Sequence, residues 1–510
     1  MLSKIYTMTI TGLKACLITV ETNISRGLPH YNVVGLGDSV IREAGSRIRA
    51  AILNSDLEYP MSRIDVNLSP ASSKKEGSHF DLPLALGILA SSGQIQLDTD
   101  TVFFGELSMD GQINGVKGIL PMVIAAKECG FKTVVVPSSN ASEAALVEDV
   151  SVYMAGTLRE VQEHINGKKI MKAFRRLPND NAYACERDFD SDYKDVIGQE
   201  NAKRGILIAA AGGHALLLEG PPGSGKTMLA ERLPQILPPL SYEEKMEVTK
   251  IYSVAGILKE KNNLVKERPY RRIYSDITRA ALLGGGISPG PGELSLAHKG
   301  VLFIDEFPLL SSQTIESLRV SLETRSVTIT RQAYSVDFPA DIMFVASANP
   351  CPCGHRWDTS NECTCTAGQL AAYDRKISDM ILDRIDIHIN VNSVNPENLR
   401  DEAILMTSAE MREKVLKTRE IQKNRYGCEL LNSKLSKREI DRYISLGKAE
   451  TDFLVNAYES MKLNMRTYNK TLMISRTIAD LDGAVDISIE HLAEALQYRG
   501  RGHGFSNNQY

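Results

Sequence analysis

Two hydrophobic patterns alternate along most of the chain: short apolar or alternating runs typical of β-strands, and longer runs with a helical period. Both occur in residues 1–165, where RIDVNLSP and KTVVVPSS predict strands and LPLALGILASSG and GILPMVIAAKECG predict helices. This mixture predicts one α/β domain. Residues 166–192 are basic and then acidic without an apolar period, which predicts a linker.

Residues 193–395 contain three strongly apolar runs, HALLLEG, GVLFIDEF and DIMFVASANP, separated by helical stretches. Such runs predict a mostly parallel sheet with helices on both faces. Residues 396–500 have few strand signals, and runs such as SAEMREKVLKTREIQKNRYG and SIEHLAEALQYRG predict a helical lid domain. Residues 501–510 are expected to form a flexible tail. The predicted fold class is therefore α/β with a helical C-terminal lid.

A glycine-rich segment, GPPGSGKT, follows the first of these central strands and precedes a helical run. This G-x-x-x-x-G-K-T pattern lets backbone N–H groups and a helix N-terminus surround phosphates. Lys226 would contact the β- and γ-phosphates, and Thr227 would offer its hydroxyl to Mg²⁺. The alternative is a chance match in a glycine-rich turn. The predicted ATP-binding residues are Gly220, Pro221, Pro222, Gly223, Ser224, Gly225, Lys226, Thr227 and Met228.

Candidate catalytic residues follow the other two strands. GVLFIDEF ends in Asp305 and Glu306, where one carboxylate can hold Mg²⁺ and its neighbour can orient the attacking water. DIMFVASANP ends with Asn349, whose amide can position that water. Arg384 and Arg476 are candidates for stabilising transition-state charge. Taken singly, these residues have ordinary alternatives: a solvated loop, a turn asparagine and structural ion pairs.

Four of the eight cysteines fall within CPCGHRWDTSNECTC. The pairs Cys351–Cys353 and Cys363–Cys365 could supply the four thiolates of a structural Zn²⁺ site, with His355 as a spare ligand. The C-x-C spacing is tighter than the usual C-x₂₋₄-C. The alternative is four reduced cysteines in a loop, although exposed thiols without a ligand are prone to oxidation.

Two segments carry side chains suited to DNA. RSVTITRQAYSVDF predicts a β-hairpin with Arg331 and Tyr334 near its tip, which would combine phosphate attraction with base stacking. KEKNNLVKERPYRRIY is rich in basic residues, including Arg271 and Arg272, that could contact the phosphate backbone. The alternatives are an ordinary exposed hairpin and a solvated basic surface.

The series GPPGSGKTMLAERLPQILPPL, EVTKIYSVAG, GGGISPGPGELSLAHKGVLFIDEF, SANPCPCG, ILDRIDIHI and RTIADL resembles the ComM (YifB) family of magnesium-chelatase-like AAA+ ATPases along nearly the whole chain. The resemblance implies that Asn349 is sensor 1, Arg384 an arginine finger reaching a neighbouring subunit, and Arg476 sensor 2. It also implies a homo-hexameric ring that drives branch migration of DNA during natural transformation, with recombination proteins as partners.

Two segments qualify the resemblance. Where the family reads RPFRSPHHTIS, this chain reads RPYRRIYSDIT, with Tyr274 and Ser275 at the two histidine positions. Residues 1–165 resemble the proteolytic domain of Lon proteases, and Lys117 matches its catalytic lysine. The nucleophile segment is replaced by GSHFDLPLALG, which has Asp81 at the critical point and Ser78 three residues earlier. Without a nucleophile the domain is expected to be catalytically inactive.

Composition constrains the remaining possibilities. A net charge of −4 and a pI near 6.2 give no overall positive field, so DNA contacts must come from local patches. No apolar run is long enough to span a bilayer, and a cytoplasmic protein without membrane contacts is expected. Three alternatives to a DNA motor remain: a magnesium-chelatase-type metal-insertion ATPase, an ATP-dependent protease and a non-catalytic scaffold. The absence of a D-x-S-x-S motif weighs against metal insertion.

Overall fold

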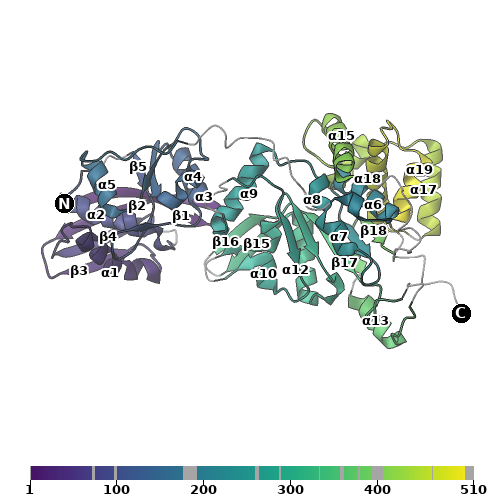
Figure 1. Ribbon diagram of the computed structural model, residues 1–510, viewed down its shortest axis with the longest axis horizontal. Helices are drawn as coiled ribbons and strands as arrows, with labels where there is room; N and C mark the ends of the chain where they lie inside the picture. Colours follow the sequence, from purple (N-terminus) through teal and green to yellow (C-terminus); the bar gives the residue numbers. More distant parts are fainter. Residues whose placement is uncertain are drawn as a thin grey trace.

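The computed structural model describes residues 2–499 except 72–74, 97–99, 176–191, 259–263, 287–288, 332–333, 357–360, 377–378, 393–405 and 462. An α/β domain lies at one end, a second α/β domain lies in the middle, and a helical domain lies at the other end (Figure 1). The predicted α/β fold class with a helical C-terminal region is confirmed. Among the described residues, no helix combines the length and apolar character needed to cross a membrane.

The N-terminal domain is built on a seven-stranded sheet of order β3-β4-β2-β1-β5-β8-β9. Side chains alternate between the two faces of β1, so Ile5 packs with α1 and α2 while Met8 packs with α3. The sheet strands are β1 Leu2–Thr11, β2 Lys14–Ser25, β3 His30–Val34, β4 Arg63–Ser69, β5 Thr101–Phe103, β8 Thr133–Pro137 and β9 Ser151–Ala155. The helices are α1 Ser39–Asn54, α2 Asp81–Ser91, α3 Ile119–Glu128, α4 Ala141–Ala144 and α5 Leu158–Ile165, and a small ribbon pairs β6 Glu106–Leu107 with β7 Ile113–Asn114.

His79 is a buried titratable group of this domain, and its ring nitrogen bonds the carbonyl of Met8 at 2.8 Å. Burial lowers the pKa of His79 to about 4. The folded domain therefore keeps the ring neutral, whereas the unfolded chain takes up a proton below about pH 6.5. Stability is full above that pH and falls as the pH is lowered.

We expect lowering the pH from 7.5 to 5 to remove about 2 kcal/mol of N-terminal domain stability through His79. Chemical denaturation at both pH values would measure it. His79→Gln, which keeps an N–H donor but does not titrate, should lose about 2 kcal/mol less over the same interval. An identical loss in both proteins would show that His79 does not cause it.

The central domain contains a five-stranded parallel sheet of order β11-β14-β17-β10-β18. In β10, Leu216 and Leu218 pack into one core and Leu217 into the core on the opposite face. The strands are β11 Tyr270–Ile273, β14 Val301–Ile304, β17 Met343–Ala348, β10 Leu216–Glu219 and β18 Ile387–Asn390. The helices are α6 Glu200–Gly212, α7 Lys226–Glu231, α8 Leu233–Ile236, α9 Tyr242–Ala255, α10 Arg279–Leu283, α11 Glu293–Leu296, α12 Ser312–Thr324, α13 Ala367–Lys376 and α14 Asp379–Leu382.

Two of these strands were not anticipated from the sequence. The segment containing β11 was assigned to a basic insertion, but it pairs in parallel with β14 at the edge of the sheet. β18 lies beyond β10 at the other edge. Two antiparallel ribbons complete the domain: β12 Gly284–Gly285 with β13 Gly290–Pro291, and β15 Ser326–Arg331 with β16 Tyr334–Pro339.

The C-terminal domain is helical, as predicted. Its helices are α15 Ser408–Tyr426, α16 Lys437–Tyr443, α17 Lys448–Ser460, α18 Met465–Leu481 and α19 Ile489–Gln497. The predicted boundary at 395/396, most of the predicted linker 166–192 and the tail 501–510 lie outside the described residues. The start of the linker is described, and there Phe174 donates its N–H to the carbonyl of Val152 in β9.

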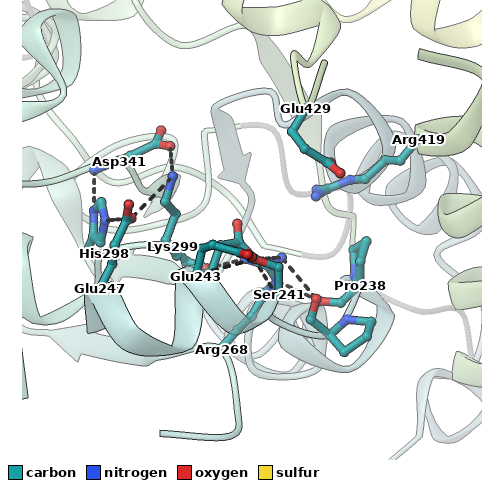
Figure 2. A network of polar contacts seen from close by, with 12 residues as sticks. Pro238, Ser241, Glu243, Glu247, Arg268, His298, Lys299, Asp341, Arg419 and Glu429 are labelled. Carbon is teal, nitrogen blue, oxygen red and sulfur yellow. Dashed lines mark hydrogen bonds and ion pairs between the residues drawn. The ribbon is translucent and has the colours of Figure 1, made fainter. Parts of the chain in front are cut away.

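A chain of polar contacts joins the lid to the core. Asp341, just before β17, forms ion pairs with Lys299 and with Lys434 of the lid. Burial raises the pKa of this carboxyl, but the two cations outweigh that effect and hold the pKa well below its usual range. Figure 2 shows Asp341 meeting His298 and Lys299, both of which also contact Glu247 of α9. The same view shows lid residue Arg419, which donates to the carbonyl of Ala210, and Arg268, which donates to the carbonyl of Pro238.

The N-terminal domain is anchored to the core through α9 and the β15–β16 ribbon. Ser253 of α9 donates its hydroxyl to the buried carboxyl of Glu143, and its carbonyl accepts the N–H of Gly118 at 3.0 Å. At the β1–β2 turn, a Cβ on Gly12 would lie 2.1 Å from a methyl carbon of Val336. This close contact places the N-terminal domain directly against the predicted DNA-binding hairpin.

Candidate nucleotide-binding site

The glycine-rich segment forms the predicted loop between β10 and α7. Gly225 caps α7 with φ = 91°, a left-handed conformation that glycine adopts at little cost. Gly220 has a steric requirement instead, because a Cβ there would lie 2.0 Å from the carbonyl oxygen of Val391. The loop therefore fits tightly between the sheet and the N-terminus of α7, a placement that suits phosphate binding.

Lys226 is buried and folds back over the loop. Its ammonium donates to the carbonyls of Gly220 and Pro221, both at 2.8 Å, and to the side-chain oxygen of Asn349 at 3.3 Å. Burial lowers the pKa of Lys226, and nearby Asp305 partly opposes that effect. The structure thus brings together three residues that the sequence assigned to one site.

The carboxylates after β14 occupy the same edge. Asp305 accepts the hydroxyl of Ser347 at 2.6 Å and faces the hydroxyl of Thr227 at 3.5 Å. Ser347 also accepts the backbone N–H of Glu306 at 3.0 Å. Ser347 was missed by sequence reasoning; the available signal was its position two residues before Asn349 on a buried strand.

These residues fit Mg²⁺ and a triphosphate. The hydroxyl of Thr227 and the carboxylate of Asp305 are oxygen ligands of the kind a hard cation prefers, and they point at one another beside the loop. Glu306 comes next in the chain, with φ = 53°, and turns away from the strand direction. The site can therefore hold a metal and place a second carboxylate beside it.

Arg384 lies near the amino ends of the parallel strands, whereas the phosphate loop lies at their carboxyl ends. It precedes β18, whose Ile387 pairs with Leu216 at the start of β10, whereas the loop follows the end of β10. The four residues of β10 span about 13 Å. Arg384 forms an ion pair with Glu323 at the end of α12. Arg384 and the phosphate loop of the same chain therefore lie at opposite ends of β10 and β18.

Arg466 shares this location and was missed by sequence reasoning. Arg466 lies in the first turn of α18 and also pairs with Glu323, with its Nη2 3.3 Å from Oε1 of that carboxylate. The only sequence signal was a basic residue at the start of a lid helix. A cavity of about 600 Å³ between core and lid is lined by six cationic residues: Arg325, Arg384, Lys434, Lys437, Arg466 and Lys470.

Arg476 is the residue expected to reach the nucleotide as sensor 2, and its contacts in the structure lie within the lid. Arg476 is buried in α18 and pairs with Asp480 at 3.0 Å. Its other N–H groups donate to the carbonyls of Ala484 and Val485, both at 2.7 Å. Its donors are used inside the lid, which matches the alternative of a structural ion pair.

Arg271 and Arg272 were expected to contact DNA, but both have acidic partners in the core. Arg271 forms two hydrogen bonds of 2.6 Å with Glu293. Arg272 bridges Glu231 at 2.9 Å and Asp305 at 2.7 Å. These carboxylates lie on α11, on α7 and directly after β14, around the edge strand β11 that carries both arginines. The DNA contacts assigned to Arg271 and Arg272 stay a prediction.

The predicted hairpin is present as β15–β16, and Arg331 pairs with Tyr334 at its end. Residues 332 and 333 lie outside the described residues, so the tip itself is not described. The hairpin is therefore confirmed as local structure. The DNA contacts assigned to Arg331 and Tyr334 stay a prediction.

The four cysteines gather in one cluster. Their sulfurs lie within 4.8 Å of one another, with Cys351 and Cys353 at 3.3 Å and Cys363 at 3.7 Å from Cys351. The backbone N–H of His355 lowers the pKa of the Cys353 thiol, whereas burial raises the pKa of the Cys351 and Cys365 thiols. Four convergent sulfurs fit a tetrahedral zinc site.

The cysteine cluster touches the phosphate loop. Gly354 has φ = 86°, and a Cβ at that position would lie 2.5 Å from Cδ of Pro222. We expect Gly354→Ala to strain the backbone and displace the loop, weakening ATP binding about tenfold or more. Titration with a fluorescent ATP analogue would measure this. Gly368→Ala, in α13 with open space around its Cβ position, is the matched control and should bind normally.

The N-terminal domain holds the residues that were compared with the serine–lysine pair of Lon proteases. Ser78 and Lys117 line one cavity of about 800 Å³, but the Ser78 hydroxyl donates to Glu106. Asp81, at the position of the expected nucleophile, is buried in an ion pair with Arg47 at 3.0 Å. The inactivity of this domain stays a prediction.

Comparisons with known proteins cover nearly the whole chain. Residues 192–399 match the family model of magnesium chelatase, subunit ChlI; residues 20–140 match that of subunit ChlI of Mg-chelatase; and residues 406–499 match that of the ChlI C-terminal region. The chain is 40% identical to competence protein ComM of Haemophilus influenzae over 503 residues, which is 98% of this chain and 97% of that protein. Protein YifB of Escherichia coli is 37% identical with the same coverage. The magnesium-chelatase 67 kDa subunit of Chlorobaculum tepidum is 28% identical over 31% of this chain and 23% of its own length.

Proposed function

Because this chain belongs to the family of magnesium-chelatase ChlI-like AAA+ proteins that includes competence protein ComM, we propose that it is an ATP-driven ring motor acting on DNA. The observation that carries the ATPase part is the convergence of Lys226, Asp305 and Asn349 at one sheet edge. Mg²⁺, when bound by Thr227 and Asp305, would neutralise charge on the β- and γ-phosphates.

The chain's own residues have distinct roles in this proposal. Lys226 exchanges the carbonyls of Gly220 and Pro221 for phosphate oxygens, which are stronger partners because they are charged. Glu306 orients the attacking water and accepts its proton, and Asn349 holds that water near the γ-phosphate.

The ring follows from Arg384. In this proposal Arg384, at the end of the strands opposite the phosphate loop, serves the nucleotide of a neighbouring copy, and such head-to-tail contacts between identical subunits can close into a ring. We propose a hexamer. The cationic cavity lined by Arg384 and Arg466 would then receive the neighbour's phosphate loop.

The DNA part rests on the relationship to competence protein ComM and on the β15–β16 hairpin. We propose that hairpins in a central channel hold a strand and that hydrolysis moves them, so that a branched junction migrates during integration of incoming DNA. The test is a labelled four-way or three-strand junction with ATP and Mg²⁺. Hydrolysis of ATP without junction resolution would argue against branch migration.

The second candidate is a metal-insertion ATPase, favoured by the magnesium chelatase family models. The two functions differ in what stimulates hydrolysis. A DNA motor should hydrolyse ATP faster with single-stranded or forked DNA, whereas a metal-insertion subunit should respond to a porphyrin-binding partner. The named magnesium-chelatase relative shares only 31% of this chain, which favours the DNA motor.

We further propose that the cysteine cluster binds structural zinc. Elemental analysis of the purified protein should find about one zinc per chain. Cys353→Ser should lower that content and the melting temperature together, whereas Cys428→Ser, an exposed cysteine outside the cluster, should change neither. Full zinc content in Cys353→Ser would contradict the assignment.

A further inference from the structure

Arg272 stands where the Mg²⁺ ligands converge. Its Nη2 lies 2.7 Å from Oδ2 of Asp305, the same oxygen that faces the hydroxyl of Thr227. Asp305 and Arg272 are both half-buried, so solvent screens this ion pair less than an exposed one. The guanidinium therefore satisfies the carboxylate that would otherwise hold the metal.

The same side chain has a second set of contacts that does not involve Asp305. Its Nη1 bonds Glu231 of α7 at 2.9 Å, and its guanidinium carbon lies 5.0 Å from the ring centre of Tyr274. A second ring, Phe303, lies 5.9 Å away. The cation–π contacts and the ion pair with Glu231 can stabilise the Arg272 guanidinium after its contact with Asp305 is broken.

We propose that Arg272 is an internal counter-ion that Mg²⁺ must displace from Asp305 before the nucleotide site is complete. A dication between Thr227 and Asp305 would stand next to a guanidinium that contacts the same oxygen, and like charges at that separation repel strongly. Arg272 then moves onto Glu231 and Tyr274. This inference rests on the proposed ATPase site and adds a positioning residue to it.

One consequence concerns metal affinity. Arg272 stabilises the metal-free site, so it raises the Mg²⁺ concentration needed to fill the site without changing the ligands themselves. Removing the guanidinium should therefore tighten metal binding.

The test measures metal binding directly. Purified full-length protein with a non-hydrolysable ATP analogue is titrated with Mn²⁺, and free Mn²⁺ is followed by electron paramagnetic resonance. Arg272→Gln should bind Mn²⁺ roughly tenfold more tightly than the unaltered protein, the effect of removing one charge-assisted competitor. Arg272→Lys keeps the positive charge, so its Mn²⁺ affinity should lie close to that of the unaltered protein. This second variant shows whether the change in Arg272→Gln comes from the lost charge or from a folding defect.

Arg271→Gln is the matched control. It removes the neighbouring arginine of β11, whose partner is Glu293 and not Asp305, so its Mn²⁺ affinity should equal that of the unaltered protein. Equal or weaker Mn²⁺ binding by Arg272→Gln, or equal tightening by Arg271→Gln, would overturn the proposal. If the unaltered protein and all variants bound neither nucleotide nor Mn²⁺, the proposed ATPase site would fall as well.

Discussion

Replacing Glu306 with glutamine is expected to lower ATP turnover by roughly 10²- to 10³-fold, the typical contribution of one general base. The amide keeps the size of the side chain but cannot accept a proton from the attacking water. Glu306 is not a partner in the Lys226 and Asp305 contacts, so the site should still bind nucleotide. Steady-state hydrolysis and nucleotide titration of the same preparations would measure the two effects separately.

Asp305→Asn provides the contrasting control for Glu306→Gln. Asp305 accepts hydrogen bonds from Ser347 and Arg272, and its proposed role is to hold the metal. The asparagine variant should therefore need more Mg²⁺ to bind nucleotide, whereas Glu306→Gln should not. If Glu306→Gln and the unaltered protein hydrolysed ATP at the same rate, the proposed carboxylate mechanism would be wrong.

The parts of the site that could be predicted share one physical cause. In a parallel sheet the carboxyl ends of the strands meet at one edge, so the residues after β10, β14 and β17 had to lie together once three apolar strands were identified. The phosphate loop was assigned from its glycine-rich motif, Asp305 and Asn349 were assigned from their places after two further strands, and the structure brings them together. The helical lid followed equally directly from its period.

What the sequence did not reveal depends on strand register. Arg272 on the edge strand β11 pairs with Phe303 on the neighbouring strand β14, and this register brings its guanidinium to Asp305. A basic YRRI segment has no apolar pattern from which an edge strand could be recognised. The ion pair of Arg476 was also not foreseen: helical spacing places this arginine one turn from Asp480, and the two charges pair inside the lid. Its role as sensor 2 stays a prediction.

Arg384→Ala is expected to lower ATP turnover by about 10³-fold or more if its guanidinium stabilises the transition state in a neighbouring subunit. Its position opposite the phosphate loop makes a stronger prediction possible. Lys226→Ala and Arg384→Ala should each be nearly inactive alone, because every interface then lacks one required group. In an equal mixture, about a quarter of the interfaces in a randomly assembled ring pair an intact Lys226 with an intact Arg384. Mixing should therefore restore activity.

The matched control for this mixing experiment is Arg319→Ala. Arg319 lies on α12 and pairs with Glu316 and, at 4.0 Å, with Glu323, the partner of Arg384. It has no proposed role at the neighbour's nucleotide, so its loss should leave turnover nearly unchanged. Hydrolysis should be measured after the two inactive variants are unfolded and refolded together, or after slow subunit exchange, with each variant alone treated in the same way. Activity that returns only in the mixture requires one subunit to supply the phosphate loop and its neighbour the arginine. A mixture as inactive as its components would place Arg384 outside the neighbour's site, leaving its ion pair with Glu323 as a structural contact between α12 and the segment before β18.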